Sequence, residues 1–150
     1  MTHRYHSVAI LVVLTALLAL LAGCGGRDSI VRATPEATAR AFVEAMQAGE
    51  YDTVSQGFEF DTFARRENPD WDTFGESQRR LIVGKLQEEK AGELRSMSGM
   101  FAQETTVGEA QTRDGRARVN VTAGANALTL HMTKRDDGWH LRRIEEATGE

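Results

Sequence analysis

Residues 116–122, RARVNVT, alternate polar and apolar side chains without a break. Successive side chains of a strand point to opposite faces of a sheet, so this pattern predicts a strand with one face in the core and the other in water. The same alternation recurs over 128–133 and 139–142, and more weakly over 105–112. Turn-forming residues separate the four segments, as is typical of an antiparallel meander; they lie at 114–115, 124–126 and 136–138.

Upstream of these strands the apolar residues recur at helical spacing. Thr34 is a suitable N-cap, Pro35 suits the first helical position, and Gly49 stands where a helix ends. The sequence therefore predicts a helix over 35–48. Its apolar stripe, with members three or four residues apart, consists of Ala39, Phe42, Val43 and Met46.

Two further helices are expected before the strands. A short one begins at Tyr51, and a longer, charge-rich one follows a capping box formed by Thr73 and Glu76. A polar connection joins them, and its aromatic residues are expected to plug one end of the core. These are Phe60, Phe63, Trp71 and Phe74.

Helices followed by hairpins place the chain in the α+β class, with N-terminal helices packed on a curved antiparallel sheet. The expected organisation is a single domain over 34–150, preceded by a leader and a tether. This length is ordinary for one domain with one core.

The leader is expected from an apolar run over 8–22 in which Thr15 is the one polar residue. Fifteen residues are too few for a transmembrane helix, which needs about 20, and the charged head before them is typical of a secretory signal. The run ends in Leu21-Ala22-Gly23-Cys24. This motif resembles the lipobox of bacterial lipoprotein precursors.

That resemblance implies a signal peptide over 1–23, a diacylglyceryl group on the sulfur of Cys24, and a tether over 24–33. The domain would then be held at a bacterial membrane on its extracytoplasmic side. Gly25 after the cysteine resembles the pattern for the outer membrane, if the cell is Gram-negative. Two or more acyl chains anchor a protein stably.

The composition argues against disulfide bonds and against nucleic-acid binding. Cys24 is the one cysteine in the sequence, so no disulfide is expected and the core alone must hold the domain. Without the leader, 17 basic and 22 acidic residues remain, a balance that argues against a nucleic-acid binder. Over 24–78 acidic residues outnumber basic ones by 11 to 5, whereas residues 79–150 are close to neutral.

The order of elements, the Thr-Pro-Glu start at 34–36, the segment FVEAMQAGEY at 42–51 and the closing Asp137-Gly138-Trp139 resemble the nuclear transport factor 2-like, cystatin-like superfamily. More narrowly, the chain is similar to small bacterial lipoproteins of that superfamily. The resemblance implies a cone in which a curved sheet wraps the helices around a pocket. It also implies self-association through the open sheet face, and it fixes no activity, because members include isomerases, dehydratases and binding modules.

The residues offer few candidates for catalysis. Tyr51, Asp52 and Asp61 are expected near the rim of a pocket, and no catalytic motif is present. His131 and His140 fall on the polar phase of their strands, without a third ligand or a metal-binding spacing. No metal and no cofactor are therefore expected.

The outer face of the sheet is the sharper candidate. If the strands pair as predicted, this face is basic on an otherwise acidic domain and could receive an acidic partner, a phosphate-bearing envelope component or a second copy. Its candidate residues are Arg116, Arg118, His131, Arg135, His140 and Arg142.

The sequence thus predicts a lipid-anchored binding or accessory domain of the cell envelope, without catalysis. Its expected partners are the membrane, through Cys24, and an envelope protein, a small ligand or a second copy. Two alternatives stay open. One is a small envelope enzyme of the isomerase or dehydratase type; the other is a structural module whose cone is filled by Phe42, Phe58, Phe60, Phe63, Trp71 and Trp139.

Overall fold

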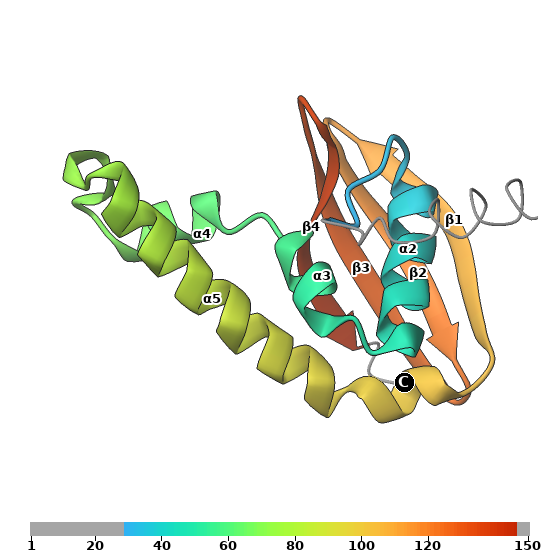
Figure 1. Ribbon diagram of the computed structural model, residues 1–150. Coiled ribbons are helices and arrows are strands. Elements are labelled where there is room, and N and C mark those ends of the chain that lie inside the picture. Colours follow the sequence, from blue (N-terminus) through green and yellow to red (C-terminus); the bar gives the residue numbers. More distant parts are fainter. Residues whose placement is uncertain (1–28, 147–150) are drawn as a thin grey trace, which may run out of the picture.

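The computed structural model describes residues 29–146, which form helices followed by a four-stranded sheet (Figure 1). The α-helices are α2 (Pro35–Ala48), α3 (Tyr51–Gln56), α4 (Asp61–Glu67) and α5 (Glu76–Ser96), with short 3₁₀ turns at Trp71–Thr73 and Ser98–Ala102. The strands are β1 (Thr105–Arg113), β2 (Arg116–Ala123), β3 (Asn126–Arg135) and β4 (Gly138–Glu146). They pair antiparallel in the order β1-β2-β3-β4, so the predicted α+β class and meander are confirmed.

Helix α2 has the predicted bounds because both ends are capped as the sequence indicates. The Thr34 hydroxyl accepts a hydrogen bond from the Ala37 N–H at 3.2 Å. Gly49 ends the helix with φ of 74°, a left-handed conformation that glycine adopts without a Cβ penalty. The apolar stripe of the helix is buried against the sheet, which places α2 across its inner face (Figure 1).

The inner face of the sheet and α2 enclose the core. Alternate residues of β2 are buried and exposed. Buried and half-buried residues alternate in the same way over Leu128–Thr133 of β3 and over Gly138–Leu141 of β4. Phe42 of α2 meets Phe101 edge to face, with ring centroids 5.5 Å apart. The fully buried side chains of the sheet include Val119, Val121, Leu128, Leu130, Met132 and Leu141.

Two short segments pair with the outer edge of β4. The Trp139 N–H donates to the carbonyl of Arg32 at 2.9 Å, and the Leu141 N–H donates to that of Gly57 at 2.9 Å. Ile30, next to the first segment, is fully buried. The residues just before Thr34, which the sequence assigns to the tether, are therefore packed on the domain.

Helix α4 and the first half of α5 stand apart from the sheet as an arm (Figure 1). Helix α4 was not predicted from the sequence. The predicted capping box of Thr73 and Glu76 was wrong, because Gly75 precedes α5 without a side-chain cap and the Thr73 hydroxyl donates to the Asp70 carbonyl at 2.7 Å. Only Ala91 and Leu94 of α5 are buried. Val83 and Leu86, in the first half of α5, are partly buried and pack against the core cluster, so one side of α5 joins the arm to the domain.

The expected aromatic plug is divided between two places. Phe58 and Phe60 stack in the core with centroids 6.0 Å apart, as a filled cone requires. Trp71 is buried away from the core cluster, against Phe74 of the arm. Phe63 is 41% exposed, so its prediction as a core residue was wrong.

Candidate functional site

The strand register assembles the predicted basic residues on the outer face of the sheet. Arg118 lies opposite His131, and His131 lies opposite Arg143. In the next row, Arg116 lies opposite Thr133, and Thr133 opposite His140. Arg116 and Arg118 are exposed, while the two histidines are half-buried between the strands. The alternation that buries the core side chains thus lines up cationic groups on the opposite face.

A bulge in β4 brings two arginines to this face where the sequence predicted one. Met132 pairs with Leu141 and His131 pairs with Arg143, so Arg142 is the extra residue between these pairs. Arg143 was missed because strict alternation assigns it to the inner face. The adjacent arginines at 142 and 143 could have indicated the bulge. Without it, Arg143 would lie opposite Leu130 on the inner face, where burial of a guanidinium is costly.

A cleft of about 690 Å³ lies between the arm and the sheet, and we call it the β4 cleft. Its walls come from α4 and α5 on one side and from β2, β3 and β4 on the other. His131 lines it, together with six cationic side chains: Arg66, Lys90, Arg116, Arg118, Arg142 and Arg143.

Three of these guanidinium groups have no partner. Arg116, Arg118 and Arg142 make no ion pair or hydrogen bond through their side chains within residues 29–146. The other cations are engaged, since Lys90 pairs with Glu93, and Arg143 donates to Glu145 at 2.9 Å. Unpaired guanidinium groups present forks of N–H donors that match carboxylate or phosphate oxygens.

His131 lies at the centre of this basic group, 2.8 Å from the Glu145 carboxylate. Burial lowers the pKa of the imidazole, and the positive charges of Arg143 and Arg118 act in the same direction. Glu145 opposes them through its hydrogen bond and its charge. The net effect is a lowered pKa, so His131 adds no positive charge near pH 7, and the cations of the β4 cleft are its five arginines and Lys90.

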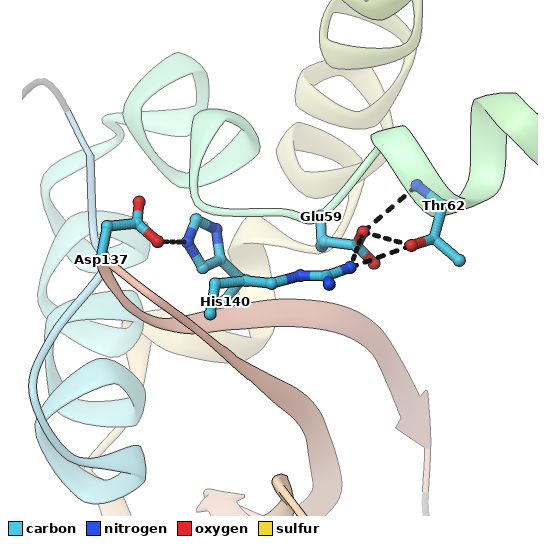
Figure 2. A network of polar contacts seen from close by, with 5 residues as sticks. Glu59, Thr62, Asp137 and His140 are labelled. Atoms are coloured by element: carbon cyan, nitrogen blue, oxygen red, sulfur yellow. Dashed lines mark hydrogen bonds and ion pairs between the residues drawn. The ribbon is translucent and has the colours of Figure 1, made fainter. Parts of the chain in front are cut away.

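A second group of polar residues fastens the root of the arm to the β3–β4 hairpin (Figure 2). The Glu59 carboxylate accepts hydrogen bonds from Arg135 and from both the backbone N–H and the hydroxyl of Thr62. Only 8% of the Glu59 side chain is exposed, against 46% of Arg135. Arg135, predicted as part of a partner face, is therefore bound within the chain, and sequence reasoning missed Glu59.

His140 is also engaged within the chain. Its Nε2 lies 2.8 Å from the Asp137 carboxylate (Figure 2). That hydrogen bond holds the pKa of Asp137 below its ordinary value. These side chains line a smaller cavity of about 540 Å³, together with Glu59 and Asp61.

The three residues predicted at a pocket rim are not brought together in this cavity. Asp61, the first residue of α4, is exposed and lines it. Asp52 is exposed on α3, and Tyr51 packs against the core with the Arg95 guanidinium 5.5 Å from its ring centroid. Neither Tyr51 nor Asp52 lines the β4 cleft or the smaller cavity.

The sequence also led to predictions about lipidation of Cys24 and about metal binding. Cys24 lies outside the described residues. Among residues 29–146, no cluster of three or more histidine, cysteine, aspartate or glutamate side chains could hold a metal ion. In that same range no helix combines the length and the apolar character needed to cross a membrane.

The comparisons with known proteins add a structural likeness. No protein-family model and no curated protein matches the chain. A solved structure of a protein described as an NTF2-like transpeptidase of Campylobacter jejuni is similar, with a TM-score of 0.47 and 13% identity. The match covers 74% of this chain and 99% of that one.

The fold class is α+β. The helices and the antiparallel sheet establish it by themselves. A likeness of this size says nothing about activity.

Proposed function

We propose that the protein is a lipid-anchored, non-catalytic binding domain of the bacterial cell envelope, held on the extracytoplasmic side through Cys24. Its ligand is a molecule bearing carboxylate or phosphate groups that binds in the β4 cleft. The observation that carries the proposal is the set of three unpaired guanidinium groups lining that cleft, those of Arg116, Arg118 and Arg142.

The size and setting of the cleft support this proposal. A volume of about 690 Å³ falls in the range of ligand sites in proteins, roughly 300 to 1,000 Å³. The arginines stand at its sheet wall, and an anion there would meet several charges at once. The arm side carries charges of both signs, Arg66 and Lys90 beside Glu89 and Glu93, so the excess of positive charge lies on the sheet wall.

The described residues support a binding domain better than an enzyme. A general acid or base needs a pKa shifted toward neutrality by an apolar wall or a nearby charge. Asp52 and Asp61 are exposed to water, and the Glu59 carboxylate already accepts hydrogen bonds from Arg135 and Thr62. These contacts fit an anchor for the arm better than a reaction centre.

The test is ligand-induced stabilisation of the full chain by tripolyphosphate. A ligand that binds only the folded state stabilises it by about 2.7 kcal/mol at one hundred times its Kd. We expect the unfolding temperature to rise by several degrees with the wild-type chain. The rise should disappear in Arg116→Glu/Arg118→Glu and persist in Arg40→Glu/Lys85→Glu, a variant of equal net charge whose altered residues are exposed and do not line the cleft.

Equal stabilisation of both double variants would show that tripolyphosphate responds to net charge rather than to the cleft. No stabilisation of the wild-type chain by tripolyphosphate or by a carboxylate-rich peptide would contradict the proposed function. Addition of salt provides a further check, because contacts between exposed charges weaken at ionic strengths well above 0.1 M.

A further inference from the structure

We propose that the β4 cleft takes an extended acidic peptide of a partner protein, which adds a strand to the free edge of β4. The inference rests on the proposed function and names the class of its ligand. Strand addition combines main-chain hydrogen bonds with side-chain recognition, and it requires an exposed sheet edge beside a groove.

The edge of β4 already pairs with two segments of this chain. The Trp139 N–H donates to the carbonyl of Arg32. Further along, the Leu141 N–H donates to the carbonyl of Gly57, and the Leu141 carbonyl accepts from the Glu59 N–H at 2.7 Å. This edge therefore has the geometry to pair with extended backbone, and both segments use it.

The pairing stops at Leu141, although β4 continues to Glu146. Leu141 pairs across the ladder with Met132, and Ile144 pairs with Leu130, two residues earlier on β3. Positions two apart in an antiparallel ladder direct their backbone groups to the same side. The N–H and the carbonyl of Ile144 therefore face the free edge, where no backbone of the described residues pairs with them.

Charge indicates that the incoming strand is acidic. Arg142 and Arg143 come directly before Ile144, and Arg118 lies in the same row as Arg143 across the sheet. Glu89 lines the arm side of the cleft. Acidic side chains of a bound strand would thus be attracted to the sheet and repelled by that part of α5.

The lining favours a peptide over a lipid chain. Two phenylalanines of the cleft already bury their surface in the core, since Phe58 is 5% exposed and Phe60 is 9% exposed. Of the large apolar residues that line the cleft, Phe63 is exposed, at 41%, and Leu86 is half-buried. An acyl chain would find little apolar surface, whereas a strand needs only the edge and occasional apolar contacts.

Fluorescence anisotropy with a labelled peptide of alternating glutamate and valine tests this inference on the full chain. Two further versions carry N-methyl groups on either the valine amides or the glutamate amides, with the charge unchanged. Only one set of amides of a bound strand faces β4. We expect the parent peptide to bind and one methylated version to bind about tenfold more weakly, as loss of roughly two hydrogen bonds predicts.

A substitution tests the same edge from the side of the protein. Ile144→Pro removes the one N–H that faces the free edge and should weaken the parent peptide about fivefold, as loss of one hydrogen bond predicts. Ile144→Val keeps the N–H and should bind normally. If Ile144→Pro fails to fold, the methylated peptides still test the edge on the wild-type chain.

Each outcome separates this inference from the proposed function. If both methylated versions bind as tightly as the parent peptide, strand addition is wrong and the anion site stands. The same conclusion follows if tripolyphosphate or phosphatidylglycerol vesicles bind while the peptide does not. If no anionic probe binds, both are wrong. If binding of the parent survives Arg116→Glu/Arg118→Glu, the peptide binds elsewhere and the inference is again wrong.

Discussion

Truncating Arg135 to alanine should destabilise the domain, because it removes the cation that neutralises Glu59. The Glu59 side chain is 8% exposed and would keep Thr62 as its remaining hydrogen-bond partner. Breaking a fully buried pair costs about 3 to 5 kcal/mol, and an exposed pair contributes about 0 to 1 kcal/mol. Because Arg135 is 46% exposed and water can partly replace it, we expect a loss of about 1 to 2 kcal/mol.

Urea and thermal unfolding measure this loss. In a domain of this size a loss of 1 kcal/mol lowers the unfolding temperature by roughly 4 °C. Arg113→Ala is the matched control, because Arg113 pairs with Asp114 while both side chains are almost fully exposed, at 92% and 87%. Its effect should stay within about 0.5 kcal/mol.

A double-mutant cycle with Glu59→Gln isolates the interaction between Glu59 and Arg135. The two residues are in direct contact, so the cycle should give a coupling energy of at least about 0.5 kcal/mol. If Arg135→Ala destabilises no more than Arg113→Ala, or if the cycle shows no coupling, the account of the arm's anchor is wrong.

Three other predictions concern His131, Gly57 and Cys24. The pKa of His131 lies below its unfolded value of about 6.5, so the unfolded chain takes up the proton first as the pH falls. The free energy of unfolding should therefore decrease below about pH 6.5, and it should decrease less steeply in His131→Gln. Equal slopes of the two proteins in pH-dependent urea unfolding would refute this prediction. Gly57→Ala places a Cβ 2.2 Å from the buried Ile30 side chain and should cost about 1 to 3 kcal/mol, with a smaller effect in an Ile30→Ala background; additive losses would exclude this clash. Cys24→Ser should abolish incorporation of labelled palmitate into the protein, and unchanged incorporation would exclude lipidation of Cys24.

The sequence predicted the sheet and α2 well because their signals are local. The alternation of β2 indicates which of its residues are buried, and the residues that cap α2 lie directly before and after the helix. These elements needed no knowledge of their neighbours. The lipid anchor at Cys24 is equally a local signal, and it stays a prediction.

The arm could not be predicted in the same way. Helix α4 buries only Ala64, so it has no apolar period to reveal it. Its root is held by Glu59 and Arg135, which are 76 residues apart in the sequence. Trp71 and Phe63 were assigned to the core because they are large and apolar, yet both lie in an arm whose position only the tertiary structure gives.

The candidate site was predicted in part for a related reason. Alternation placed Arg116, Arg118 and His131 on one face, and the register agrees. The bulge that adds Arg143 depends on pairing between strands. The β4 cleft exists because α5 faces this part of the sheet, and no single segment of the sequence encodes that arrangement.

Native mass spectrometry of the protein gently extracted from its own envelope tests the binding account most directly. We predict a reproducible added mass on the wild-type chain and on Arg40→Glu/Lys85→Glu, and its loss in Arg116→Glu/Arg118→Glu. A bare chain in all three preparations, or an added mass that survives the change of both cleft arginines, would contradict the claim that this cleft is the binding site.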